Sequence, residues 1–347
     1  MLKFLEESRF SKAGDILVTS QGAAFSYHNN LYIEDYHNRR EIVIPPNLKL
    51  RFLRMKGNSI EFVSAQGELF YINSKEGNEL NLINYAPDEE GYGLYDHYLN
   101  NKNISILILS KKRFLKIIMY DFLSKEVIYL IENLEKLTVL YVDEERIIFY
   151  AKENESFIMK CFKLDENKLL WSFDLSKYST DDLDMSSLVT VYNGSIIFSI
   201  IFSINFTHTL CIHIQTGRLN WISENDTDII DVAEGKAYQF NRGFIRIISC
   251  DTGELLHYQE NWFDTNLYKD SYGVSSIIAC FYKNYIISFS AQAEIFIIDK
   301  EKNTVVNSFV PPFKGRESFR RSLMMYKDYL FMMDSSPTIY KYRLEND

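Results

Sequence analysis

The stretch Ile214-Gln215-Thr216-Gly217-Arg218-Leu219-Asn220-Trp221 decides the fold. It contains the end of an apolar strand, a tight polar turn and the start of a second strand. Similar phrases stand before it at residues 164–171 and after it at residues 250–255. Repetition of one strand–turn–strand unit predicts an array of similar β-sheets.

The turn of this phrase can be followed along the whole chain of 347 residues. Its positions are Asn38, Lys75, Ser124, Glu166, Thr216, Thr252 and Glu301. They lie roughly 36 to 50 residues apart with a mean of about 44, the length of a four-stranded blade of a β-propeller. Strand-like runs alternate with turn signals, and no long stretch has helical periodicity. The sequence predicts an all-β chain that forms a single β-propeller domain over residues 1–347.

The two ends of the chain predict the blade count. After the seventh turn, three strand-like runs remain, at residues 321–326, 329–333 and 338–343. One strand of the last blade is therefore missing, and we expect residues 1–7 to supply it and close the ring, which removes an open sheet edge. The first complete set of strands is predicted at residues 15–19, 24–28, 31–35 and 41–44. This arrangement gives eight blades, or seven if one set is not a blade.

Two fragments, Thr216-Gly217-Arg218-Leu219-Asn220-Trp221 and Asp251-Thr252-Gly253-Glu254-Leu255, resemble repeats of the quinoprotein-like (PQQ-like) and WD40-like β-propellers. The quinoprotein-like family includes quinone-dependent dehydrogenases and non-catalytic scaffolds. A quinone-dependent member implies export, a metal ion and a disulfide between adjacent cysteines beside the cofactor. Adjacent cysteines are missing here, so the resemblance favours the non-catalytic branch without a cofactor. Trp171 and Trp221 are expected to pack between neighbouring blades.

The composition disfavours some classes of partner. Apolar residues make up 46% of the chain and charged residues 24%, which is enough to bury a core. With 38 basic and 47 acidic residues, the formal net charge is −9. The resulting field repels phosphate backbones and anionic lipid surfaces and attracts cationic partners. We expect neither nucleic acid nor membrane as a partner.

Three further features predict a cytoplasmic location. The N-terminus reaches Glu6 and Glu7 before an apolar region of signal-peptide length develops. The most apolar stretch, residues 196–206, is shorter than a membrane span and is predicted as a buried strand. The cysteines show no CxxC spacing and are expected to be reduced thiols in the core: Cys161, Cys211, Cys250 and Cys280.

The sequence predicts no catalytic and no metal-binding residues. Its six histidines form no HxxxH or HExxH spacing, and no GxSxG elbow is present. The fragment Gly91-Tyr92-Gly93 lacks the third glycine and the lysine of a phosphate-binding loop. A site assembled around a central channel from single residues of several blades leaves no spacing signal, so a propeller hydrolase or lyase stays open as an alternative.

The connections between blades share one face of a propeller, and the longer ones combine acidic and aromatic residues. They span residues 85–93, 176–184 and 261–273, whereas residues 311–320 form a basic connection. Aromatic anchors within a charged rim are typical of protein interfaces. The predicted partner-binding residues are Asp88, Glu89, Glu90, Tyr92, Tyr178, Asp181, Asp182, Asp184, Asp226, Asp228, Trp262, Phe263, Asp264 and Tyr268. In the alternative reading, the loops are merely polar and their rings fold back on the blades.

The sequence as a whole favours a non-enzymatic, monomeric, cytoplasmic propeller that binds a basic protein through this face. A concrete version is a bacterial immunity protein that neutralises a basic toxin such as a nuclease. The bias toward Lys, Asn, Ile, Tyr and Phe is compatible with an AT-rich bacterial genome. Two alternatives stay open, a propeller enzyme with a site in the channel and an architectural subunit of a larger complex.

Overall fold

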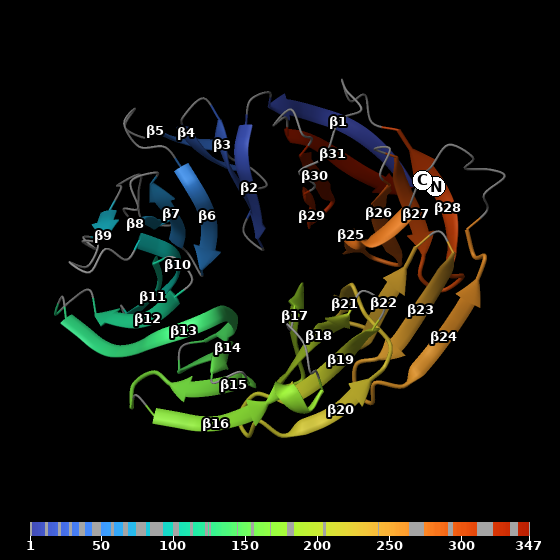
Figure 1. Ribbon diagram of the computed structural model, residues 1–347. Coiled ribbons are helices and arrows are strands. Elements are labelled where there is room, and N and C mark those ends of the chain that lie inside the picture. Colours follow the sequence, from blue (N-terminus) through green and yellow to red (C-terminus); the bar gives the residue numbers. More distant parts are fainter. Residues whose placement is uncertain are drawn as a thin grey trace. The chain divides into compact units, whose positions relative to one another are not determined.

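The computed structural model consists of β-strands joined by turns (Figure 1). Within residues 2–121 it describes the strands. From residue 124 it describes the chain except 125, 144, 154–155, 167, 179–183, 204–205, 242, 264–273, 291–293, 311–321, 334–338 and 347. Side chains are described at most positions from Ile106 onward. In this part of the chain the one helix is a single 3-10 turn, η1 (Leu175–Lys177), so the predicted all-β class is confirmed.

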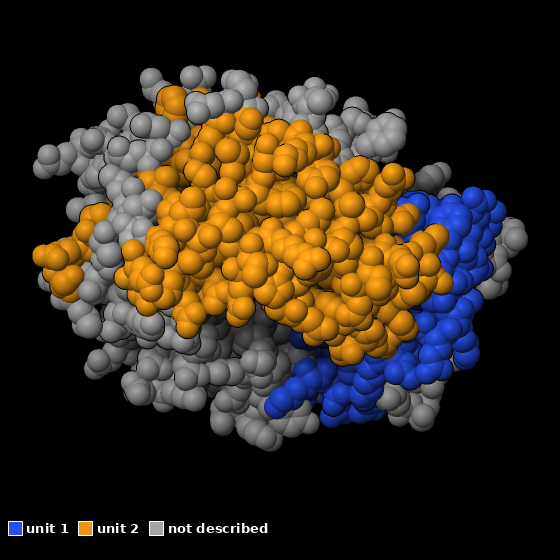
Figure 2. Space-filling view, turned by 90° about the horizontal axis from the view of Figure 1, so that it is seen from below, with its two compact units in different colours: residues 1–85, 238–246, 257–347 blue, residues 86–237, 247–256 orange. Residues whose placement is uncertain are grey.

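The chain divides into two compact units (Figure 2). Unit 1 comprises Met1–Tyr85, Tyr238–Arg246 and His257–Asp347, and it holds four complete four-stranded antiparallel sheets. Their strands are β2 (Ala13–Thr19), β3 (Gly22–Tyr27), β4 (Asn30–Glu34) and β5 (Arg39–Val43); β6 (Leu50–Lys56), β7 (Ser59–Ser64), β8 (Leu69–Asn73) and β9 (Asn81–Ile83); β25 (Val274–Tyr282), β26 (Tyr285–Ser290), β27 (Ile295–Asp299) and β28 (Thr304–Phe309); and β29 (Ser322–Tyr326), β30 (Tyr329–Met333), β31 (Ile339–Asn346) and β1 (Leu2–Phe10).

Unit 2 comprises Ala86–Ala237 and Ile247–Leu256. It holds a seven-stranded sheet, β10 (Gly93–Leu99), β11 (Ile104–Lys111), β12 (Phe114–Asp121), β13 (Glu126–Val142), β14 (Arg146–Glu153), β15 (Ser156–Lys163) and β16 (Lys168–Asp174). It also holds a four-stranded sheet, β17 (Asp184–Tyr192), β18 (Ser195–Ser203), β19 (Phe206–His213) and β20 (Leu219–Ser223). A further sheet carries residues of both units: β21 (Ile229–Asp231), β22 (Lys236–Phe240), β23 (Phe244–Ser249) and β24 (Leu255–Glu260).

The repeated turn predicts the strand pattern correctly. Ser124, Glu166, Thr216, Thr252 and Glu301 each lie in the turn between the third and fourth strand of a set. The remaining two predicted turns, at Asn38 and Lys75, fall between β4 and β5 and between β8 and β9, outside the described residues. Local turn chemistry is therefore sufficient to locate this hairpin in the five sets whose turns the structure describes.

The chain ends pair as strands of one sheet. β1 runs antiparallel to β31, from the pair Leu2 and Asn346 to the pair Phe10 and Ile339. In unit 1, the first strands of the four sheets lie side by side in the order β25, β29, β2 and β6. The closing strand, predicted within residues 1–7, extends to Phe10, because Ser8, Arg9 and Phe10 find backbone partners in Lys341, Tyr340 and Ile339 at the start of β31.

The seven-stranded sheet departs from separate four-stranded sets. β13 is 17 residues long and serves as the fourth strand of one set and the first strand of the next. The register shifts between Glu135 and Thr138, and Lys136 between them has a φ of 50°. Because the strand bends there in place of a loop, the two sets form one sheet.

The apolar stretch predicted as a buried strand forms two strands. Ser195–Ser203 forms β18, and its described side chains from Ser195 to Ile200 are buried. The next strand, β19, begins at Phe206. The free thiols of Cys161, Cys211 and Cys250 are buried as expected, whereas Cys280 is partly buried.

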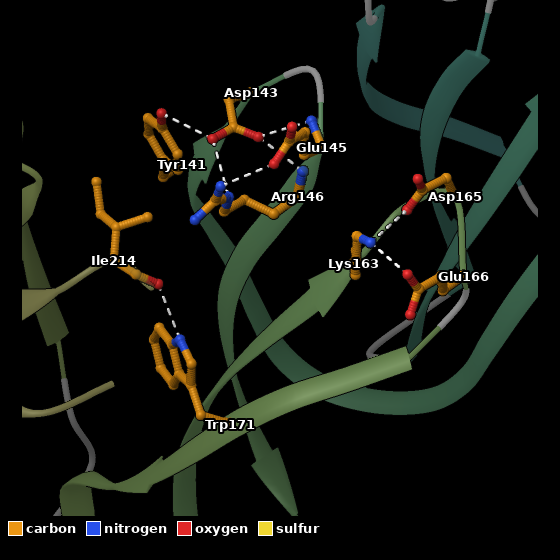
Figure 3. A network of polar contacts seen from close by, with 9 residues as sticks. All are labelled: Tyr141, Asp143, Glu145, Arg146, Lys163, Asp165, Glu166, Trp171 and Ile214. Carbon is orange, nitrogen blue, oxygen red and sulfur yellow. Dashed lines mark hydrogen bonds and ion pairs between the residues drawn. The ribbon is translucent and has the colours of Figure 1, made fainter. Parts of the chain in front are cut away.

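Trp171 on β16 packs against the turn between β19 and β20. Its Nε1 donates a hydrogen bond of 2.9 Å to the backbone oxygen of Ile214 (Figure 3). Gly217 in that turn has a φ of +65°, and a Cβ at this position would lie 2.5 Å from the indole ring. The ring therefore contacts the backbone at a point where any side chain would collide with it. The predicted packing of Trp171 on a neighbouring sheet is confirmed.

Trp221 on β20 repeats this contact one sheet further along. Its Nε1 donates a hydrogen bond of 3.0 Å to the backbone oxygen of Cys250. Gly253, at a φ of +72°, would place a Cβ 2.5 Å from the indole. Both contacts lie within unit 2, and they join its sheets through the same pair of residue types. The contact is thus a property of the repeated phrase.

The next junction breaks the pattern. In the repeated phrase, His257 takes the position of Trp221, and Asn303, at a φ of 53°, takes the position of Gly253. Over the described residues, His257 Nε2 and Asn303 Oδ1 are buried atoms without a hydrogen-bond partner. Two polar groups therefore stand where the earlier junctions have an indole and a glycine.

The docking geometry predicts unequal effects of two glycine substitutions. Gly253→Ala should lower the free energy of unfolding by about 1–2 kcal/mol through the left-handed backbone alone. Displacement of the Trp221 ring should add about 1–3 kcal/mol. Gly194→Ala is the matched control, because Gly194 has a φ of +71° but no atom within 4 Å of a Cβ, so it should show the backbone cost only. Equal losses in urea unfolding would contradict the docking role of Trp221.

A second contact between sheets lies in unit 1. Tyr282 at the end of β25 donates a hydrogen bond of 2.6 Å from its hydroxyl to Asp328 Oδ1, in the turn between β29 and β30. Lys283 Nζ lies 3.5 Å from the same carboxylate oxygen. The hydrogen bond from Tyr282, more than the charge of Lys283, lowers the pKa of Asp328. Asp328 therefore stabilises the fold above its unfolded pKa, and this contribution is lost as the pH falls through its folded pKa.

Tyr282→Phe should raise the pKa of Asp328 and reduce the free energy of unfolding by about 0.5–1.5 kcal/mol at neutral pH. The difference from wild type should shrink once the pH drops below the ordinary carboxyl pKa of 3.8. Carboxyl NMR titration and urea unfolding at several pH values measure both effects. Tyr285→Phe is the control, because no hydrogen bond of the Tyr285 hydroxyl is found within the described residues. A pH-independent difference would contradict this assignment.

Candidate protein-binding site

The structure describes part of the predicted partner-binding set. Asp226 and Asp228 lie on the connection from β20 to β21, Tyr178 follows η1, and Trp262 and Phe263 follow β24. Asp184 begins β17 and is described by its backbone alone. The remaining members fall outside the described residues: Asp88, Glu89, Glu90, Tyr92, Asp181, Asp182, Asp264 and Tyr268.

A cluster of buried hydroxyl groups fixes the β20–β21 connection. Thr209 Oγ1 on β19 donates a hydrogen bond of 2.8 Å to the backbone oxygen of Asn225. Ser199 Oγ on β18 lies 3.0 Å from Thr209 Oγ1 and 3.3 Å from Thr227 Oγ1, and the two threonine hydroxyls are 3.3 Å apart. All three side chains are buried. Because a buried hydroxyl must find a partner, the cluster ties the connection to the sheet below it.

The hydroxyl cluster, Ser199, Thr209 and Thr227, places two carboxylates near the surface. Asp226 and Asp228 flank Thr227 and are half-buried. Asp226 Oδ1 accepts a hydrogen bond of 2.8 Å from the backbone N–H of Thr227, which orients this carboxylate on its own turn. The connection therefore presents two negative charges on a backbone that is held at several points, and a preorganised surface loses less entropy on binding.

The start of the β16–β17 connection is also anchored. Asp174 Oδ1 accepts a hydrogen bond of 2.9 Å from Ser176 N at the start of η1, and Leu175 is buried. The ring of Tyr178 stacks on Phe173 with centroids 5.9 Å apart and an interplanar angle of 6°. Tyr178 thus packs against the sheet and supports the start of this connection.

The two rings at the start of the β24–β25 connection point into unit 1. Trp262 and Phe263 are only 6% and 3% exposed. Trp262 Nε1 donates a hydrogen bond of 2.7 Å to the backbone oxygen of Asn241, and its ring meets Phe240 edge-on. Phe263 packs edge-on against Phe296 at 5.2 Å. For these rings the structure agrees with the alternative reading in which aromatic residues fold back on the sheets, so we leave both out of the surface proposed below.

A separate polar network lies at the turn between β13 and β14, which joins the first and second strands of a set and is not one of the connections between sets (Figure 3). Asp143 Oδ1 accepts hydrogen bonds from the backbone N–H groups of Glu145 and Arg146 at 2.8 and 2.7 Å. Its Oδ2 accepts from the Tyr141 hydroxyl at 3.1 Å and lies 3.1 Å from Arg146 Nε. Burial, with a smaller effect of Asp143, raises the pKa of Tyr141. These contacts close the β13–β14 turn and leave this carboxylate fully occupied.

The described side chains offer little for catalysis by a thiol or a metal. Burial raises the pKa of Cys161 and of Cys250 to about 12, which keeps both thiols protonated and unreactive at neutral pH. Among the described residues, no three His, Cys, Asp or Glu side chains gather as a metal site would require.

The hydroxyl cluster could not be predicted from the sequence. Ser199 is visible in the sequence as an interruption of an apolar stretch, and Thr209 as a polar residue within an apolar strand. Thr227 lies in a polar connection, where a threonine attracts no notice. The signal is weak because the three residues meet only after β18, β19 and the connection have packed together.

Thr209→Val should reduce the free energy of unfolding by about 1–3 kcal/mol, because it leaves the Asn225 backbone oxygen and the two other hydroxyls, which are buried, without this partner. Hydrogen exchange at Asn225 to Asp228 should accelerate more than at the remaining strands of unit 2. Thr207→Val on the same strand is the control, since Thr207 is half-buried and makes no hydrogen bond to a described side chain. Unchanged exchange in Thr209→Val would contradict the anchoring role.

Comparisons with known proteins identify the fold of this chain. No protein-family model and no curated protein sequence matches the chain. The solved structure of BamB from Moraxella catarrhalis matches with a TM-score of 0.64 at 9% identity, covering 98% of this chain and 100% of that one. The chain has the β-propeller fold. A propeller of Dos1 matches at 0.62 with 11% identity over 98% and 95% of the two chains, and the C-terminal WD40 domain of Sif2 at 0.61 with 12% identity over 99% of each.

At these identities the likeness establishes the fold and leaves the activity of the propeller open. In the part of the chain that the structure describes, no helix is long and apolar enough to cross a bilayer.

Proposed function

We propose that this propeller is a non-enzymatic, protein-binding module that recognises a basic polypeptide through the connections between its sheets. The observation that carries this proposal is the β20–β21 connection, where a buried hydroxyl cluster anchors the backbone that carries the half-buried Asp226 and Asp228. Carboxylates on an anchored backbone, in the field of a chain with net charge −9, attract a cationic partner and accelerate its association.

The proposed architecture is a ring of eight blades closed by β1. Seven sheets, one of which contains two sets of four strands that share β13, correspond to eight blades. The pairing of β1 with β31 supports closure by the N-terminal strand. In such a ring the blade connections share one face, so Asp226 and Asp228 would act together with the acidic residues of the other connections.

In its most specific form, the proposal is a cytoplasmic bacterial immunity protein that neutralises a basic toxin, such as a nuclease. A nuclease must attract phosphate and is therefore cationic around its site, which makes it complementary to an acidic surface. Tight neutralisation requires fast association, and fast association is what electrostatic attraction supplies.

Affinity purification from the native organism's lysate tests the proposal. The full-length protein should retain one basic partner at low salt and release it, or hold it less tightly, at high salt, because the Debye length falls to about 3 Å at 1 M. Retention of no specific partner would contradict the binding proposal and direct attention to the channel. Stoichiometric retention of several proteins would indicate an architectural subunit.

Once a partner is found, the double variant Asp226→Lys with Asp228→Lys should slow its association by roughly tenfold at low salt. The variant Asp165→Lys with Glu166→Lys is the matched control, because it makes the same charge change in the β15–β16 turn, at the start of a fourth strand and away from the connections. Stopped-flow association rates at several salt concentrations measure the effect. Equal slowing by both variants would point to overall charge and would contradict the β20–β21 connection as the contact.

A further inference from the structure

Within unit 1, one face of the sheet that contains β23 carries a cation stacked on two aromatic rings. The guanidinium carbon of Arg246 lies 5.1 Å from the ring centroid of Phe244 and 5.7 Å from that of Tyr258. The two rings are 6.0 Å apart at an interplanar angle of 36°. Phe244 and Arg246 share a face because they alternate along β23 with the buried Ile245.

The guanidinium of Arg246 uses few of its five donors. Nη1 donates a hydrogen bond of 3.0 Å to Gln239 Oε1, which together with the rings fixes the plane of the group. Nε is buried and has no hydrogen-bond partner over the described residues. Nη2 is bonded to none of the described residues either and is at least partly exposed, on a side chain that is half-buried.

The carboxylate of Glu260, two residues after Tyr258 on β24, has a different partner. Glu260 Oε1 accepts a hydrogen bond of 3.1 Å from the Tyr258 hydroxyl, and the described part of the chain gives Arg246 no ion pair with a carboxylate. Tyr258 is itself 45% exposed. A positive charge stripped of part of its hydration by two rings, with open donors at its outer end, is suited to an incoming anion.

We propose that Arg246, Phe244 and Tyr258 form a binding site for the carboxylate of an Asp or Glu side chain on a partner polypeptide. The flat donor edge of a guanidinium matches the two oxygens of a carboxylate, and the exposed Tyr258 ring contacts the apolar stem of the incoming side chain. Tyrosine and arginine are the residue types that dominate the binding energy of protein interfaces. The site is independent of the acidic β20–β21 connection, so either can fail without the other.

The charges favour a carboxylate over a phosphate. Receptors for phosphate gather several cations, whereas this cluster supplies one guanidinium beside the carboxylate of Glu260. A phosphate dianion would meet more repulsion from Glu260, and from a chain of net charge −9, than a single carboxylate does.

NMR of the full-length protein with isotope-labelled arginine tests this site. The probe is N-acetyl-glutamate methylamide, with N-acetyl-glutamine methylamide as its neutral match. The Arg246 Nε–H resonance, assigned through Arg246→Lys, should move with the acidic probe at a concentration at least about fivefold lower than with the neutral one. Equal movement with both probes, or none with either, would overturn the proposal. Half-saturation at lower concentration with inorganic phosphate would also overturn it, in favour of a phosphate site.

Two variants test whether the binding of the acidic probe depends on this site. Tyr258→Leu should weaken the acidic probe by about two- to fivefold, the factor that loss of one exposed cation–π contact represents. Arg218→Lys, at an exposed arginine in the β19–β20 turn, should leave the titration unchanged. An effect of Arg218→Lys equal to that of Tyr258→Leu would show that the titration does not report on contacts at this site, and would overturn the assignment to it.

Discussion

The contact on which unit 2 depends is the docking of a tryptophan from one sheet onto a glycine turn of the next. Trp171 meets Gly217 and Trp221 meets Gly253, and each indole also donates a hydrogen bond to a backbone oxygen of the same turn. The flat ring needs close approach to the backbone, the turn needs a positive φ, and glycine meets both needs. One residue pair therefore sets both the spacing and the orientation of neighbouring sheets.

The connections between neighbouring sheets differ in how their side chains are placed. The β24–β25 connection places Trp262 and Phe263 in the interior, whereas the β20–β21 connection uses a buried hydroxyl cluster and keeps its carboxylates at the surface. Both arrangements satisfy buried groups, but only the second presents charge. The acidic connection at Asp226 and Asp228 thus differs from the site at Arg246, where a single guanidinium stacks on two aromatic rings.

Much of the fold could be predicted from the sequence because its signals are local. The alternation of strands and the turn at Thr216 depend on neighbouring residues. The strands near both chain ends depend on neighbouring residues in the same way. The joining of two sets through β13 could not be predicted, since it depends on a bend at Lys136 that carries no glycine or proline. For the candidate site, the structure places Asp226 and Asp228 on the β20–β21 connection, whereas the inward packing of Trp262 follows the alternative reading in which the rings fold back on the blades.

The sequence by itself determined the β class, the repeat and the tryptophan and glycine positions, because turn chemistry and strand periodicity act between residues close along the chain. Only the tertiary structure decided which polar groups meet. Ser199, Thr209 and Thr227 converge, and Arg246 lies between Phe244 and Tyr258, because pairing register and packing bring separate strands together. The energy of a buried hydroxyl or a stacked guanidinium depends on such distant partners, which no local pattern encodes.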